Sequence, residues 1–95
     1  MATPLINLTI RSKEKLLFRD KVWAVTSYNA KGVFDILAEH ANFICVISQS
    51  IVVHKVDKKE LVFKIDNGIM IVENDTVSMY VGVVSAIPEG ARTQL

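Results

Sequence analysis

The sequence predicts an all-β protein, a flattened antiparallel β-sandwich of about ten short strands. Short apolar runs rich in β-branched and aromatic residues, which favour a pleated, half-buried surface, recur along the whole chain. Polar or glycine-containing turns separate these runs at regular intervals, as is typical of a sandwich or a barrel. No segment keeps a helical period over the roughly 11 residues that identify a helix.

The spacing of apolar residues along the chain predicts where the individual strands lie. Ile6, Leu8 and Ile10 alternate with other residues and put one apolar face on the first strand. Trp23-Ala24-Val25 breaks the alternation of the third strand, which indicates either a bulge or cover on both faces. In chain order, the predicted strands are residues 6–10, 16–18, 21–28, 33–37, 43–47, 51–56, 61–65, 69–72 and 77–84.

The breaks between these strands are predicted from turn residues. The predicted turns are residues 12–14, 19–20, 29–32, 48–50, 57–59, 66–68 and 74–75. A turn is predicted at Asn67-Gly68 because both residues tolerate the positive φ that tight hairpins require.

The middle of the chain, Lys31 to Val46, holds two apolar runs joined by a tight loop at residues 38–41. Gly32 opens this stretch, at a place where the backbone can take a positive φ. The loop carries one carboxylate and one histidine, Glu39 and His40. We expect one domain over residues 1–84 and a short tail over residues 85–95, because Pro88 and Gly90 stop any strand there.

Composition excludes several classes of function. Eleven basic and ten acidic residues give a formal net charge of +1. This net charge predicts no general attraction to nucleic acid or to an anionic membrane. No apolar run approaches the roughly 20 residues that span a bilayer. The N-terminus lacks the basic region and apolar core of a signal peptide. A single cysteine, Cys45, fits a reducing compartment.

No group of residues predicts catalysis or a bound metal or cofactor. Neighbouring residues on a strand point to opposite faces, so Glu39 and His40 are weak evidence for an acid–base pair. His40 is interpreted as a structural or interface residue, and His54 as a solvent-facing one. Cys45 lies in an apolar run and reads as a small hydrophobe rather than a nucleophile. The function is therefore expected to lie in a surface.

Two motifs and their order resemble the epsilon subunit of F-type ATP synthases over about the first 80 residues. Residues 32–44 are similar to the family signature Gly-x-x-Gly-x-x-Pro-x-His-Ala-Pro followed by two apolar residues. Its matching positions are Gly32, Ile36, His40, Ala41, Phe43 and Ile44. Residues 66–72 are similar to a second signature, Ser-Gly-Gly-x-x-Glu-Val, in which Gly68 and Val72 match. The opening residues 8–18, with Ser12 and Phe18, also resemble the start of the family.

The chain departs from the family pattern at five positions. Asp35 and Asn67 replace glycines, Ala38 and Asn42 replace prolines, and Ile71 stands where an acid is usual. Without the two prolines, the loop at His40 loses their rigidity. The resemblance covers the β-sandwich, and we expect the helical hairpin that follows it in the family to be absent here.

The resemblance implies a non-catalytic subunit in the central stalk of a proton-translocating synthase (sodium-translocating in some members). It implies binding to the gamma subunit and to the ring of c subunits, which couples rotation to ATP synthesis. The implied location is peripheral, on the cytoplasmic face of the bacterial inner membrane or the equivalent organelle membrane. The isolated chain is expected to be a monomer without a transmembrane segment, a metal or a cofactor.

The resemblance also assigns two interfaces. The implied gamma-subunit contacts are His40, Ala41 and Phe43. The implied c-ring contacts are Tyr28, Asn29, Ala30 and Lys31. The resemblance assigns no role to Trp23. From the sequence, Trp23 is either an interface anchor or a core residue beside a bulge. The alternative function is a free-standing interaction module on the same sandwich, and co-purification with gamma separates the two.

Overall fold

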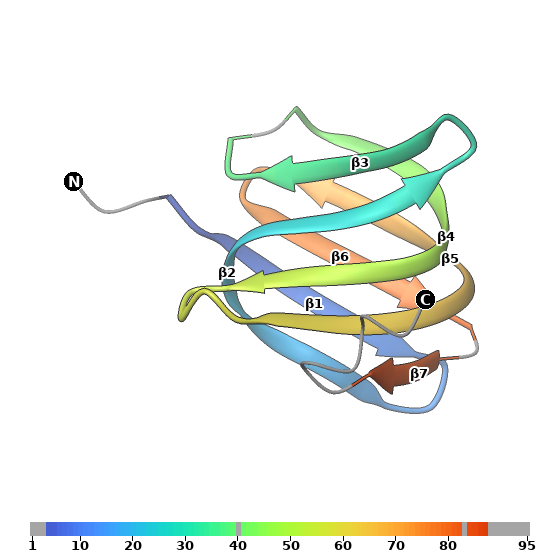
Figure 1. Cartoon of the computed structure of the whole chain (residues 1–95). Helices are drawn as coiled ribbons and strands as arrows, with labels where there is room; N and C mark the ends of the chain where they lie inside the picture. Colours follow the sequence, from blue (N-terminus) through green and yellow to red (C-terminus); the bar gives the residue numbers. More distant parts are fainter. Residues whose placement is uncertain (1–3, 40, 83, 88–95) are drawn as a thin grey trace.

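Seven β-strands form one curved sheet in the computed structural model, which describes residues 4–39, 41–82 and 84–87. The all-β prediction is therefore confirmed. The strands, shown in Figure 1, are β1 (Ile6–Ser12), β2 (Leu16–Asn29), β3 (Gly32–Leu37), β4 (Phe43–Lys55), β5 (Glu60–Glu73), β6 (Thr76–Val81) and β7 (Val84–Ile87).

The predicted count of about ten short strands is wrong, because three strands are long and bent. β2 and β5 have 14 residues each and β4 has 13. Three predicted turns, at residues 19–20, 48–50 and 66–68, lie inside these strands rather than between strands. At the second of them, β4 shifts register between Ser48 and Gln49, and Gln49 takes a φ of 71°. Polar residues at such a bend have the composition of a turn, although the hydrogen-bonded ladder continues past them.

The sheet closes on itself, so the molecule is closer to a barrel than to a flattened sandwich. The strand order β1-β6-β5-β4-β2 returns to β1 through the β1–β2 pairing. β3 extends from β2, and β7 pairs with β5. β1 and β6 run parallel, whereas every other described pairing is antiparallel, which corrects the purely antiparallel prediction. The extents of 36 × 28 × 28 Å fit this rounded shape.

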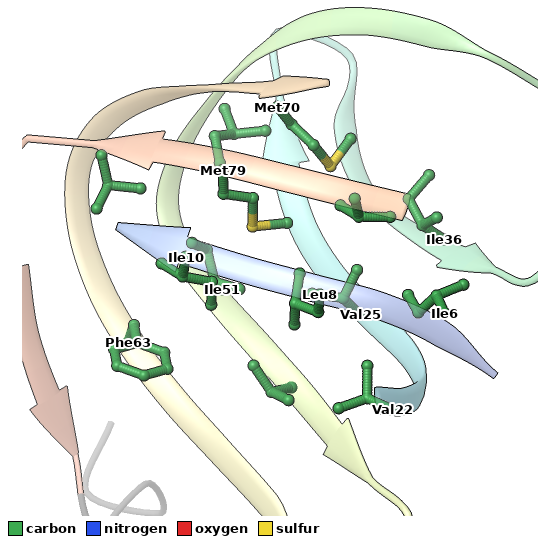
Figure 2. Packing of buried hydrophobic residues seen from close by; sticks show 14 of the residues in the cluster. Ile6, Leu8, Ile10, Val22, Val25, Ile36, Ile51, Phe63, Met70 and Met79 are labelled. Carbon is green, nitrogen blue, oxygen red and sulfur yellow. The ribbon is translucent and has the colours of Figure 1, made fainter. Parts of the chain in front are cut away.

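Alternating side chains from most strands fill the interior (Figure 2). In β1, Ile6, Leu8 and Ile10 all point inward, as their spacing predicts. Met70 and Met79 are register partners on β5 and β6 and are fully buried, in agreement with their prediction as core residues. The buried residues therefore follow the period-2 pattern even where the strand boundaries differ from the predicted ones.

Gly68 lies where β5 passes close to β6, which explains why a glycine is needed there. A Cβ at this position would lie 2.6 Å from the backbone oxygen of Tyr80. We expect Gly68→Ala to lower the free energy of unfolding by about 1–3 kcal/mol, since the two strands must separate to admit the methyl group. Gly82→Ala is the matched control, because its Cβ would meet nothing nearer than 3.6 Å. Urea unfolding measures both variants, and equal stabilities would contradict the close-approach argument.

The predicted boundary between residues 84 and 85 falls inside β7, and positions 88–95 lie outside the described residues. No helix in the described part of the chain is long and apolar enough to cross a bilayer.

Candidate protein-binding surface

An apolar face covers the outer side of the sheet where β4, β5 and β6 lie next to one another. It consists of Ile44, Val46, Ile69 and Tyr80, which are exposed, and the half-buried Ile71. Ile44 is 69% and Val46 is 66% exposed. The pairings Ile44↔Ile71, Val46↔Ile69 and Ile69↔Tyr80 make the five side chains cross-strand neighbours on one side of the sheet. Contiguous apolar surface of this kind marks a protein-interaction site more often than a solvated face.

The same strands bury their alternate residues, so both sides of this part of the sheet are apolar. Ile47, Met70 and Met79 point into the core from β4, β5 and β6. An apolar run without polar alternation is typical of a strand covered on both faces. The interior covers one face, and the other has no cover within the described part of the chain.

A surface hollow of about 260 Å³ adjoins the apolar face at the start of β4. It is lined by Asn42, Phe43, Ile44, Ile71, Val72 and Glu73. The hollow therefore connects the apolar face to the segment that the sequence assigns to the gamma subunit. Its size suits an apolar side chain of a partner, of the kind that anchors a protein interface.

The predicted gamma contacts belong to the loop before β4 and, for Phe43, to the first position of β4. His40 lies outside the described residues, Ala41 is exposed, and Phe43 is half-buried against the core. Two hydrogen bonds to the β5–β6 turn fix the loop: Asn74 N donates to Asn42 Oδ1 at 2.7 Å, and Glu39 N donates to Asp75 Oδ1 at 3.2 Å. The turn thus supports a loop in which Ala38 and Asn42 stand where the resembled signature has prolines.

The predicted c-ring contacts are the last two residues of β2, Tyr28 and Asn29, and the two-residue turn that leads to β3, Ala30 and Lys31. Ala30 and Lys31 are exposed, whereas Tyr28 and Asn29 are half-buried. Asn29 Oδ1 accepts a hydrogen bond from Lys31 N at 2.8 Å and closes the turn. Gly32 follows with a φ of 121°, which L-residues rarely adopt.

The described residues of the two predicted interfaces lie at opposite ends of β3 (Figure 1). β3 has six residues, which at about 3.3 Å per residue separates the ends by roughly 20 Å. One strand therefore connects the two predicted interfaces.

The structure also places Trp23, His54 and Cys45, the other residues that the sequence singles out. Trp23 is 39% exposed and lies against the His54 ring with the centroids 5.4 Å apart, so it is not a core residue. His54 is half-buried and hydrogen-bonded rather than solvent-facing. Burial raises the pKa of the Cys45 thiol, which keeps the reactive thiolate scarce near neutral pH.

Sequence reasoning missed the apolar face itself. The signal was present in residues 43–47, where Ile44 and Val46 are as apolar as their inward neighbours. That run identifies a strand, but only the pairing of β4 with β5 and of β5 with β6 shows that the outward residues join into one surface.

Comparisons with known proteins identify what this chain is similar to. A family profile described as ATP synthase, Delta/Epsilon chain, beta-sandwich domain matches residues 5–86. A search of curated protein sequences finds no significant match.

Two solved structures carry chains of similar fold. One is a chain of the Euglena gracilis mitochondrial ATP synthase, from a cryo-EM structure of OSCP, F1 and the c-ring. It aligns with a TM-score of 0.73 and 25% identity, over 93% of this chain and 56% of its own length. A chain from the Tetrahymena thermophila mitochondrial ATP synthase central stalk and c-ring aligns with a TM-score of 0.70 and 14% identity, over 90% and 69%.

The two solved structures support different conclusions about this chain. At 14% identity the Tetrahymena chain shows a shared fold alone, and this chain spans 56% of the Euglena chain. The profile is the stronger evidence, since it covers most of the sequence and nearly every described strand. The chain belongs to the family of ATP synthase delta/epsilon chains, through their β-sandwich domain.

Proposed function

We propose that this chain is a non-catalytic central-stalk subunit of a proton-translocating F-type ATP synthase. It binds the gamma subunit and the c-ring, and so helps to transmit rotation to ATP synthesis. The observation that carries the proposal is the uncovered apolar face on β4, β5 and β6, in a chain that belongs to this family. Such a face needs a partner, and the family indicates which partner that is.

The gamma subunit covers the apolar face in this proposal. Its footprint starts at His40, Ala41 and Phe43 and continues along β4 to Val46. The hollow beside Phe43 accepts an apolar side chain of gamma, and the exposed ring of Tyr80 forms the far border. An apolar centre with polar surroundings is the usual anatomy of a stable protein interface.

The c-ring meets the turn at Tyr28, Asn29, Ala30 and Lys31. This turn lies at the other end of β3 from the start of the gamma footprint, and the footprint approaches it along β4, because Ser48 pairs with Tyr28. The subunit is then peripheral to the membrane, seated on the ring on the cytoplasmic face of a bacterial inner membrane or the equivalent face in an organelle.

A charge placed in the β2–β3 turn is expected to weaken c-ring binding. Ala30→Glu adds a carboxylate that must lose water at the contact, so we expect binding to detergent-solubilised c-ring to weaken about tenfold or more. Gamma binding should not change. Lys13→Gln, in the exposed β1–β2 turn, makes the same one-unit change in net charge and is the control. Equal c-ring affinities for the two variants would contradict the assignment of this turn.

Co-expression tests the whole proposal. The chain is tagged and expressed with the gamma and c subunits of its own organism, and the purified material is analysed by mass spectrometry. Recovery of both subunits supports a stalk role. Recovery of neither, from a folded chain, favours a free-standing interaction module on the same fold.

A further inference from the structure

Two segments that lie far apart in the sequence exchange hydrogen bonds beside the proposed gamma footprint. Glu39 N, in the loop between β3 and β4, donates to Asp75 Oδ1 at 3.2 Å. Asn74 N, in the turn between β5 and β6, donates to Asn42 Oδ1 at 2.7 Å. Each segment contributes one backbone donor and one side-chain acceptor. The two bonds therefore hold the loop near both of its ends.

Both backbone donors belong to residues with a left-handed conformation. Glu39 has a φ of 68° and Asn74 has a φ of 58°. L-residues other than glycine adopt this conformation at a cost in free energy, which is smaller for asparagine. Such residues persist where neighbouring groups hold them, and they gather at functional sites. Here a side chain of the other segment binds the N–H group of each residue, so the shape of the loop depends on the turn.

The β5–β6 turn is a fixed support for this loop. The carbonyl oxygen of Asp75 accepts a hydrogen bond from Asn7 N at 2.7 Å, and Asn7 lies on β1, whose alternate residues are buried in the core. The loop is attached to the same core through Ala38 at its start and through Phe43 directly after it. Removing a side-chain bond between loop and turn is therefore expected to change the loop and to leave the barrel intact.

The loop also forms part of the hollow in which the proposed function places an apolar side chain of gamma. Asn42 lines this hollow of about 260 Å³ together with Phe43, whereas Asp75 lies outside its described lining. The Asp75 carboxylate therefore acts on the hollow through the loop. A loop that already has its bound shape loses less conformational entropy on association, which strengthens binding.

We propose that the β5–β6 turn presets the shape of the gamma-binding loop, with Asp75 and Asn42 as its positioning residues. The inference rests on the proposed function, because gamma is the partner for which the loop is shaped. It adds a second requirement for binding, since a turn outside the apolar face then controls the affinity. Ala38 and Asn42 stand where the resembled signature has prolines, so no proline ring fixes φ at these positions and the two bonds shape the loop instead.

Residue-resolved hydrogen exchange of the isolated chain tests the preset shape without gamma. Asp75→Ala removes the acceptor of the Glu39 N–H group. We expect this amide to exchange roughly three- to tenfold faster, the effect of about one solvent-screened hydrogen bond. Asp75→Asn keeps an acceptor oxygen at the same place and should restore slow exchange.

Asp57→Ala is the matched control. Asp57 is also an exposed aspartate whose Oδ1 accepts one backbone N–H group, that of Lys59 at 3.0 Å, but it lies in the turn between β4 and β5. This variant should leave exchange of the Glu39 amide unchanged.

Calorimetric titration with purified gamma measures the consequence for binding. We expect Asp75→Ala to weaken binding roughly three- to tenfold, because the loop must then be ordered on association. Asp75→Asn should restore the affinity, and Asp57→Ala should leave it unchanged. The urea midpoints of Asp75→Ala and Asp57→Ala should both stay close to that of the unmodified chain, since each loses one exposed hydrogen bond.

The two measurements together decide the proposal. Faster exchange and weaker gamma binding that both recover in Asp75→Asn support the positioning role. Unchanged exchange of the Glu39 amide in Asp75→Ala, or unchanged gamma affinity, would overturn it. Weaker binding that does not recover in Asp75→Asn would also overturn it, because the carboxylate charge would then contact gamma directly. Absence of gamma binding by the unmodified chain would instead contradict the proposed function, so the two failures are distinguishable.

Discussion

Val46→Lys is expected to weaken binding of the gamma subunit by about 100-fold or more, while the fold stays intact. Val46 lies on the apolar face, two residues from Ile44 on β4 and directly across from Ile69 on β5. An ammonium group there loses its water when gamma covers the face, and the loss of about 3 kcal/mol is typical of a change at the centre of an interface. The side chain is 66% exposed in the free chain, so stability should change by less than about 1 kcal/mol.

Val33→Lys is a closely matched control for this experiment. Val33 is the same residue type, also lies on a strand, and is 62% exposed, but it belongs to β3 and not to the apolar face. Calorimetric titration of each variant with purified gamma measures the difference. Equal losses of affinity would place gamma elsewhere or spread its contact over the whole sheet.

Phe63→Ala should lower the free energy of unfolding by about 3–5 kcal/mol, a large part of the 5–15 kcal/mol typical of a domain. Phe63 is buried in the first half of β5, and its ring meets Phe18 edge-on with the centroids 6.5 Å apart. Truncation leaves a cavity between β5 and β2 and removes an aromatic pair. The fluorescence of Trp23 follows urea unfolding and gives the midpoint.

Phe63→Leu is the control, because it keeps most of the volume and should cost less than about 1.5 kcal/mol. If Phe63→Ala and Phe63→Leu unfold at the same urea concentration, Phe63 does not fill a rigid part of the core. A loss of cooperativity in Phe63→Ala would instead show that β5 unfolds separately from the remaining strands.

The sequence predicts where side chains point better than where strands end. Ile6, Leu8 and Ile10 are buried as their alternation predicts, since alternation depends only on local strand geometry. Residues 48–50 and 66–68 have the composition of turns, yet the chain continues through them as bent strands. Whether such a segment turns or bends depends on cross-strand pairing, which composition does not contain.

The candidate surface was predictable only in part. The resemblance to the family assigns His40, Ala41 and Phe43 to one interface and Tyr28 to Lys31 to the other. Of these, Tyr28 to Lys31 precede β3, and the described residues Ala41 and Phe43 follow it. The apolar face joins residues that are far apart in the chain, such as Val46 with Ile69, 23 positions apart, and Ile44 with Ile71, 27 positions apart. The contact between Thr26 and His54, 28 residues apart, likewise depends on the pairing of β2 with β4. Long-range register is the information that a single sequence lacks.

Site-specific photo-crosslinking in the assembled synthase tests the central claim most directly. A photoreactive amino acid is placed at position 46, 30 or 33, the complex is irradiated, and the linked subunits are identified by mass spectrometry. We predict that position 46 links to gamma, position 30 links to subunit c, and position 33 links to gamma far less than position 46 does. A complex that contains the chain but gives no link from position 46 to gamma would contradict the account.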